Sequence, residues 1–387
     1  MKVALIGIGQ AGGKVVEALI DYELQSRVNF IAAAIAVNTA RADLLGLRHI
    51  PEENRVLIGQ YHVKGHGVGA DNELGTTVAS EDIGEVLAAI DDIAMNHVDA
   101  FFLVAGLGGG TGSGGAPVIA RELKRLYTEP VYGLGLLPSP EEGGIYTLNA
   151  ARSFLTFVRE VDNLIVFDND AWRKGGESLQ GGYTEMNREI ARHIGLLLSA
   201  GEPAEGEVAE SVVDASELIN TLASGGVSTI GYASAAVEHQ SPGLLARFRN
   251  GHAETPDDNA TNRVLSVVRR ATLGRLSLPC NVKSAERALV VVAGQPRHLD
   301  RKGIERARRW LEAETGSMEV RGGDYPIAKT DHLGAVVLLS GVYDVPRIKE
   351  LQQVAIEAQR NIADRAELAP GALADLIDTD ESLDPLF

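Results

Sequence analysis

The chain has 387 residues, of which 45% are hydrophobic and 23% charged, a composition typical of a folded globular protein with two or three domains. This length excludes a peptide hormone, a disulfide-stapled miniprotein and a single small binding module. With 36 Lys+Arg against 53 Asp+Glu, the formal net charge is −17, which would repel a nucleic-acid backbone and argues against a nucleic-acid partner.

Cation usage, cysteine content and hydropathy bear on the surroundings of the chain. Arg greatly outnumbers Lys, and an acidic, Lys-poor surface suits the salt-rich cytoplasm of a halophile, where about 1 M salt shortens the Debye length to about 3 Å. Cys280 is the only cysteine, so we expect neither a disulfide within the chain nor a thiolate metal site. Without a run of about 18 apolar residues or a signal-peptide pattern, we expect a cytoplasmic protein with no direct membrane insertion.

The first half of the chain alternates short apolar runs with amphipathic stretches, a pattern that predicts a parallel sheet with helices on both faces. The runs lack polar alternation, as expected of strands buried on both sides. They predict strands at Val3–Ile8, Phe30–Val37, Ala100–Ala105, Val131–Leu137 and Leu164–Phe167. A long helical pattern follows Tyr183 and ends near Gly201, where a loop rich in Gly, Pro and Glu marks the end of the first domain.

The second half has the pattern of a smaller mixed α+β domain. We expect strands at Val227–Tyr232, Arg287–Ala293, Met318–Arg321 and Gly334–Val342, and helices at Thr261–Leu273, Asp300–Glu314 and Pro346–Arg360. The stretch from Ala235 to Ala260 is polar and shows no apolar periodicity, which predicts a long surface loop. From Asp364 onward the chain is acidic and weakly periodic, so we predict a tail.

The first glycine turn, Gly7-Ile8-Gly9-Gln10-Ala11-Gly12, follows an apolar strand and has the GxGxxG spacing of a dinucleotide site. That function also requires a carboxylate at the end of the second strand, but Asn38 and Thr39 stand there and Asp43 lies further on. A Walker A motif does not fit either, because Lys14 is followed by Val and Ile8 occupies the required Gly position.

The second glycine turn, at 106–115, is the stronger signal because ten residues hold seven glycines between a buried strand and a helix start. Consecutive backbone N–H groups there can form an anion nest for phosphate, reinforced by the helix N-terminus. A flexible linker is the alternative, but linkers rarely occupy such a position. A third turn, at 65–75, could cover the phosphates from another side. His62 and His66 are four residues apart there, and we expect them to be exposed rather than metal ligands.

In this order, the three turns and the GGGTGSG signature at 108–114 resemble the tubulin/FtsZ superfamily, and several segments are similar to the archaeal tubulin-like CetZ group. The resemblance covers about residues 1–360. It implies a Rossmann-like parallel-sheet GTPase domain at 1–184, a long central helix and loop at 185–212, a smaller α+β C-terminal domain at 213–360 and an acidic tail at 361–387. It also implies GTP or GDP and Mg²⁺ as cofactors.

The resemblance further implies a set of nucleotide-binding residues. From the first loop, the second loop and the γ-phosphate region these are Gln10, Ala11, Gly12, Gly13, Lys14, Asn38, Thr39, Gly69, Ala70 and Asn72, with Gln10 near Mg²⁺, which is held mainly by the phosphates. From the main phosphate loop they are Gly108, Gly109, Gly110, Thr111, Gly112, Ser113 and Gly114. Around the ribose and guanine they are Pro138, Glu142, Asn169, Tyr183 and Asn187, although Tyr146 stands where FtsZ proteins carry an Arg.

The chemistry of Tyr183 and Asn187 fits a purine independently of the resemblance. Residues four apart project from one face of a helix, so the ring can stack on a base while the amide bonds its edge. An Asn offers both a donor and an acceptor, which suits guanine. The alternative is a buried Tyr beside a surface Asn, and the phosphate loops favour the nucleotide interpretation.

Asp214 and Glu217 open a predicted helix, where acids often serve only as caps. The resemblance implies that this DxxE matches the synergy loop of α-tubulin, whose acids reach the nucleotide of the neighbouring subunit. A carboxylate there could orient or deprotonate the water that attacks the γ-phosphate. The predicted active site would then be completed between subunits.

We therefore expect a GTP-hydrolysing cytoskeletal protein that self-associates head-to-tail into protofilaments. The CetZ resemblance implies control of cell shape and motility, with possible protein partners for the tail. A dinucleotide-dependent oxidoreductase would leave the second glycine turn unexplained. A nucleotide-binding regulator that does not polymerise remains the alternative.

Overall fold

The computed structural model describes residues 1–172, 179–200, 202, 213–237, 256–358 and 360. The predicted tail from Asp364 and most of the predicted loop at 235–260 lie outside the described residues. Inside that predicted loop, the strand before it runs on to Ala236 and the helix after it begins at Pro256.

Ten strands of the described chain form one continuous sheet, in the order β3-β2-β1-β4-β5-β6-β7-β10-β8-β9. Neighbours from β3 to β7 pair in parallel, β10 pairs antiparallel with both β7 and β8, and β9 is parallel to β8. The strands are β1 (Val3–Ile8), β2 (Ile31–Asn38), β3 (Arg55–Leu57), β4 (Ala100–Gly106), β5 (Val131–Leu137), β6 (Asn163–Asp168), β7 (Val227–Ala236), β8 (Arg287–Gly294), β9 (Glu319–Pro326) and β10 (His332–Ser340).

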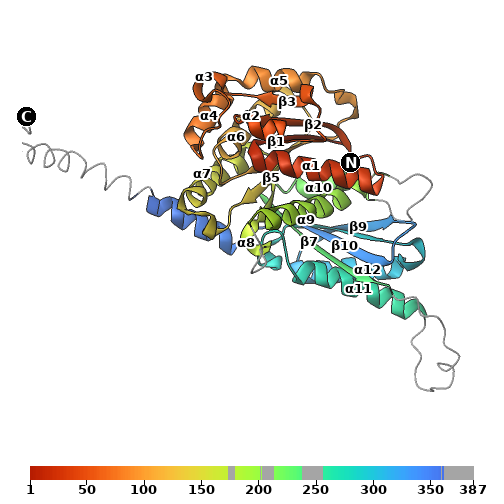
Figure 1. Cartoon of the computed structure of the whole chain (residues 1–387). Coiled ribbons are helices and arrows are strands. Elements are labelled where there is room, and N and C mark those ends of the chain that lie inside the picture. The colour runs from red at the N-terminus through yellow and green to blue at the C-terminus, as the bar shows by residue number, and fades with distance from the viewer. Residues whose placement is uncertain (173–178, 201, 203–212, 238–255, 359, 361–387) are drawn as a thin grey trace, which may run out of the picture.

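Helices cover both faces of this sheet (Figure 1). They are α1 (Gly9–Ser26), α2 (Arg41–Leu45), α3 (Gln60–Val63), α4 (Asn72–Glu81), α5 (Ile83–Asp91), α6 (Thr111–Leu126), α7 (Gly144–Glu160), α8 (Asn169–Trp172), α9 (Leu179–Ser199), α10 (Ala215–Leu222), α11 (Pro256–Leu273) and α12 (Arg301–Thr315), followed by a helix at 346–358. The central helix α9 thus begins before residue 185 and includes Tyr183.

Each face of the sheet carries its own hydrophobic core, because successive strand residues point to opposite sides. On β1, Leu5 packs into the core beneath α1 and α9, whereas Ile6 and Ile8 pack into the core beneath α6 and α7. All five strands predicted in the first half are present, and the complete burial of β1, β5 and β6 explains why they show no polar alternation.

His193 is a completely buried polar side chain in the core beneath α9. Its ring stacks on Phe167 at 6.0 Å and meets the rings of Trp172 at 5.1 Å and Tyr232 at 5.0 Å. Neither ring nitrogen has a hydrogen-bond partner among the described residues. Burial lowers the pKa of His193 to about 3, so the ring is neutral at pH 7.

Candidate functional site

Two glycine turns lie side by side at the carboxyl edge of the parallel strands. The turn after β1 leads into α1, the turn after β4 leads into α6, and β1 and β4 are hydrogen-bonded neighbours. The strand order reverses between these two strands, because β2 and β3 lie on one side and β5 and β6 on the other. In open α/β sheets, the crevice at such a switch point is where ligands bind.

The N-termini of α1 and α6 lack capping groups, which gives this crevice a positive electrostatic character. Neither helix has a side-chain N-cap hydrogen bond or an acidic residue in its first turn. The first residues of the two helices lie in close contact. A Cβ added to Gly9 in α1 would lie only 3.0 Å from the backbone nitrogen of Gly112 in α6. Two converging helix N-termini present free N–H groups and the positive ends of two dipoles, an arrangement that suits a phosphate.

The glycines of the GGGTGSG signature serve two different purposes. A Cβ on Gly110 would lie 2.4 Å from Val68 Cγ2, so Gly110 lets the turn at 65–75 approach the start of α6. A Cβ on Gly114 would lie 2.4 Å from the carbonyl oxygen of Asn72, so Gly114 lets α4 approach α6. A Cβ added to Gly12, in the first glycine turn, would likewise lie 2.1 Å from the carbonyl oxygen of Val104. At Gly109, by contrast, no atom lies within 4 Å of the added Cβ. Gly109 therefore borders open space.

Several side chains predicted to bind nucleotide bond to one another instead of facing outward. The hydroxyls of Thr39 and Thr111 share a hydrogen bond of 2.7 Å. The Asn72 amide donates to the Ser113 hydroxyl at 2.8 Å. Asn38 accepts from the backbone N–H of Thr39 at 2.8 Å. These bonds fix the shape of the loops and leave backbone N–H groups as the candidate phosphate donors.

Asn149 is a site residue that the sequence analysis missed. It is buried in α7, and its Nδ2 donates to the carbonyl oxygens of Ala70 at 2.7 Å and Gly108 at 3.0 Å. Ala70 belongs to the third glycine turn and has a left-handed φ of 62°. Asn149 therefore joins the turn at 65–75 to the turn after β4. One turn further along α7, Ser153 donates to the carbonyl oxygen of Ser113 at 2.8 Å.

A signal for these two residues was present in the sequence. Asn149 and Ser153 are polar residues four positions apart, and both fall on the buried face of α7 among Ala150 and Phe154. Paired polar residues on an apolar helix face need buried hydrogen-bond partners.

The loops after β5 and β6 bring a second group of predicted residues together. Glu142 Oε1 accepts from the backbone N–H of Ser139 at 2.7 Å and from Asn169 Nδ2 at 3.2 Å. Asn169 is buried at the start of α8, and Pro138 is buried where β5 ends. Tyr146 lies against Gly108, because a Cβ added to Gly108 would lie 3.2 Å from the Cβ of Tyr146.

The first turns of α1 expose three other predicted residues. Gln10, Ala11 and Lys14 are exposed, and Lys14 Nζ donates to the carbonyl oxygen of Gly46 at 3.2 Å. Gly69 has a left-handed φ of 58° and no atom within 4 Å of an added Cβ, so it also borders open space.

The direction of α9 places Tyr183 and Asn187 at the same edge. Gly195 packs on Tyr22 of α1, and the backbone nitrogen of Met1 donates to the carbonyl oxygen of Leu198 at 3.0 Å, so the C-terminal ends of α1 and α9 lie together. The two helices lie side by side in Figure 1 and run parallel. Gln10 on α1 and Tyr183 on α9 each lie twelve residues before this contact, about 18 Å back along their helix axes. Tyr183 is therefore at the same end of the sheet as Gln10.

Asp214 and Glu217 lie elsewhere. Asp214 is the N-cap of α10 and accepts from the backbone N–H of Glu217 at 2.9 Å. Asn163 at the first position of β6 donates to the carbonyl oxygen of Leu222, so α10 ends at the amino edge of that strand. The helix packs on β8 and β9, which are five and six strands away from β4, roughly 24–29 Å across the sheet.

The environments of these two acids differ. A hydrogen bond from Ser216 and the helix N–H groups lower the pKa of Asp214. Burial, followed by repulsion from Asp214, raises the pKa of Glu217. One oxygen of Glu217, Oε2, is buried and has no hydrogen-bond partner among the described residues.

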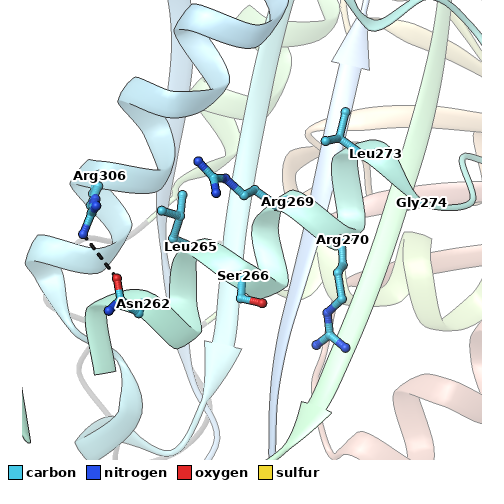
Figure 2. A pocket seen from close by; sticks show the side chains of 8 residues that line it. All are labelled: Asn262, Leu265, Ser266, Arg269, Arg270, Leu273, Gly274 and Arg306. Carbon is cyan, nitrogen blue, oxygen red and sulfur yellow. Dashed lines mark hydrogen bonds between the residues drawn. The ribbon is translucent and has the colours of Figure 1, made fainter. Parts of the chain in front are cut away.

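Other surface features do not add to this site. A pocket of about 730 Å³ lies on α11 and α12, and its lining includes Arg269, Arg270 and Arg306 (Figure 2). Arg306 donates a hydrogen bond to Asn262 across the two helices. Within the described ranges, no cluster of three or more His, Cys, Asp or Glu could hold a metal ion, and His62 instead pairs with Glu81 at 2.6 Å. No helix in the described part of the chain is long and apolar enough to cross a bilayer.

Comparison with known proteins gives matches over both halves. A model described as Tubulin/FtsZ family, GTPase domain, matches residues 2–176, and one described as Tubulin-like CetZ, C-terminal domain, matches residues 176–357. The chain is 66% identical over 390 residues to the tubulin-like protein CetZ3 of Haloferax volcanii, with 100% of both chains covered.

Two solved structures from the same organism are similar to the fold. CetZ1 as a GDP-bound monomer gives a TM-score of 0.83 at 62% identity, covering 93% of this chain and 100% of that one. CetZ2 as a GTPγS-bound protofilament gives a TM-score of 0.82 at 47% identity, covering 95% and 100%.

Proposed function

Because the chain belongs to the CetZ family of tubulin-like proteins, we propose that it binds GTP and GDP and assembles head-to-tail into filaments. The observation that carries this proposal is the pair of uncapped helix N-termini at the switch point of the sheet. Two solved relatives, CetZ1 as a GDP-bound monomer and CetZ2 as a GTPγS-bound protofilament, agree with it. The halophilic relatives also match the acidic composition of this chain.

The nucleotide would lie along the carboxyl edge of the sheet. Its phosphates would meet the backbone N–H groups of the loop at 108–113 and the start of α1, beside the open space at Gly109. The ribose would lie against the loop from Pro138 to Glu142, and the guanine against Asn169, Tyr183 and Asn187. The carboxamide groups supply the paired donor and acceptor that guanine requires.

Mg²⁺ would be held mainly by phosphate oxygens and water, which is how this ion is usually bound. Gln10, an exposed amide at the start of α1, would lie near the ion. The bound ion would neutralise charge on the phosphates.

We propose that hydrolysis needs a second subunit. Asp214 and Glu217 lie away from their own glycine loops, because α10 ends at the amino edge of β6 and Glu217 is within electrostatic reach of Arg321 near the start of β9, at the same edge. Stacking the amino edge of one subunit on the carboxyl edge of the next would bring Glu217 to the γ-phosphate. Its carboxylate would then orient or deprotonate the attacking water. From the CetZ resemblance, we propose control of cell shape and motility as the cellular role.

One experiment tests assembly and chemistry together. The full chain in high KCl is mixed with GTP, GDP or ATP, and sedimented protein and released phosphate are measured over a range of protein concentrations. We expect GTP-specific pelleting, and phosphate release per subunit that rises above a threshold concentration. GTP binding without pelleting at any concentration would instead indicate a regulator that does not polymerise.

A further inference from the structure

Arg347 links the last described helix to a loop of the nucleotide site. It is the second residue of the helix at 346–358 and is 9% exposed. One terminal nitrogen, NH2, donates to the carbonyl oxygen of Pro138 at 3.0 Å, a contact between residues 209 positions apart. The other, NH1, donates to Glu350 on the same helix at 3.0 Å.

The same guanidinium also faces the loop that begins with Asn169. Arg347 Nε lies 3.7 Å from Asp168 Oδ2 at the end of β6. Asp168 is 4% exposed, and its other oxygen accepts from the backbone N–H of Asp170 at 3.2 Å. Burial raises the pKa of Asp168 to about 6, although the positive charge of Arg347 opposes that shift. The positive charge of Arg347 therefore favours the ionised form of Asp168 against the cost of burial.

We propose that Arg347 is a positioning residue that couples the helix at 346–358 to the two loops holding the ribose and the base. The proposal rests on the proposed function and deepens it. Arg347 touches the carbonyl oxygen at the start of one loop and the carboxylate at the start of the other, so it fixes the spacing between Pro138 and Asn169. Glu142 and Asn169, which would contact ribose and guanine, follow within five residues of those anchors.

Thermodynamic linkage then works in both directions. If a rigid helix favours the binding-competent spacing of the loops, bound nucleotide must favour the docked helix by the same free energy. The helix at 346–358 therefore has a physical connection to the occupancy of the nucleotide site. The γ-phosphate lies outside this coupling, because its expected contacts come from other loops.

The test compares four proteins by their dissociation constants for GDP, GTP and ADP. Arg347→Ala removes the link, and Arg347→Lys keeps the charge but cannot contact both loops in the same way. Lys349→Ala is the matched control, because it removes one charge from the same helix while its partner is the half-buried Asp344, which lies outside the two loops. The fourth protein is the parent.

We expect Arg347→Ala to weaken GDP binding by about tenfold or more, the effect of leaving a buried acceptor unpaired. The preference for GDP over ADP should fall, because the base loop loses its position, while the GTP-to-GDP ratio stays at the parent value. Arg347→Lys should recover part of the preference, and Lys349→Ala should match the parent. An unchanged affinity for GDP, or an equal loss for GDP and ADP, would overturn the coupling.

Hydrogen exchange provides a second measurement. In the parent, GDP should slow exchange over 346–358, and this protection should disappear in Arg347→Ala but not in Lys349→Ala. Without nucleotide, Arg347→Ala should already exchange faster over 138–142. Equal protection of the helix in parent and variant contradicts the coupling. A parent that binds GDP and ADP equally contradicts the proposed function itself, which separates the two failures.

Discussion

Thr39, at the end of β2, and Thr111, the first residue of α6, share a hydrogen bond of 2.7 Å between their side-chain oxygens. Both residues are buried. The bond ties the end of one strand to the helix start that follows β4, across β1. The glycine loop is therefore held from its side by a pair of polar groups that satisfy each other.

This pair predicts a non-additive effect on stability. Thr111→Val keeps the shape but leaves the Thr39 hydroxyl unpaired, and should lower the free energy of unfolding by about 1–3 kcal/mol. Replacing both threonines by Val should cost less than the sum of the single changes, since no buried group is then left without a partner. Urea denaturation of the four proteins measures this coupling. Strict additivity would show that the two hydroxyls do not depend on each other.

Two neighbouring glycines should respond differently to substitution by Ala, one in stability and the other in GTP binding. Gly110→Ala forces a Cβ to within 2.4 Å of Val68 Cγ2, so it should destabilise the fold by about 1–3 kcal/mol. Gly109→Ala meets no atom, so its thermal unfolding should match the parent while its affinity for GTP falls, because the methyl group occupies the proposed phosphate space. Gly84→Ala in α5, where an added Cβ also meets no atom, is the control for both the unfolding and the GTP-binding measurement. If Gly109→Ala binds GTP like the parent, the phosphate does not occupy the space beside Gly109.

His193 should make the protein sensitive to acid. Its pKa is about 3 in the folded chain, against an ordinary value of 6.5. Between pH 6.5 and 3, the unfolded chain therefore binds a proton at this side chain and the folded chain does not. This group alone lowers the free energy of unfolding by about 1.4 kcal/mol for each pH unit between 6.5 and 3. His193→Phe should flatten the measured slope between pH 6 and 4 by about one proton. A slope equal to that of the parent would mean that the buried ring is already charged.

Substitution of Glu217 tests the proposed mechanism of hydrolysis directly. Glu217→Ala should bind GTP like the parent, because the glycine loops are untouched, while turnover falls by a factor of about 10²–10⁴. Its polymers should outlast those of the parent, and mixing the two should slow hydrolysis more than the variant fraction predicts. Normal turnover would reduce Asp214 and Glu217 to a helix cap. The same conclusion would follow if activity per subunit were independent of concentration.

The sequence predicted the parallel sheet well because each buried strand leaves a continuous apolar run. It did not predict β3, which has three residues, too few for a recognisable pattern. Nor could it predict that β10 lies between β7 and β8, because that order depends on packing between segments far apart in the chain.

Within the site, the glycine signature was easier to find than to interpret. Its density suggested close approach to a ligand, yet Gly110 and Gly114 closely approach protein atoms and Gly109 faces open space. Asn149 and Arg347 escaped notice because neither belongs to a motif. Each acts through backbone carbonyl oxygens, and which carbonyl a side chain will meet is decided only by the tertiary fold.

The glycine loops lie at the carboxyl edge of the strands, while α10 ends at the amino edge of β6. A row of such subunits stacked edge to edge has two unlike ends. If the active site is completed between subunits, the last nucleotide would be uncovered at one end, and the last pair of acids would have no nucleotide to act on at the other. The uncovered nucleotide would persist until another subunit arrives, so growth itself would trigger hydrolysis one subunit behind the tip. The chemical polarity of the β-strands would thereby become the polarity of the whole polymer.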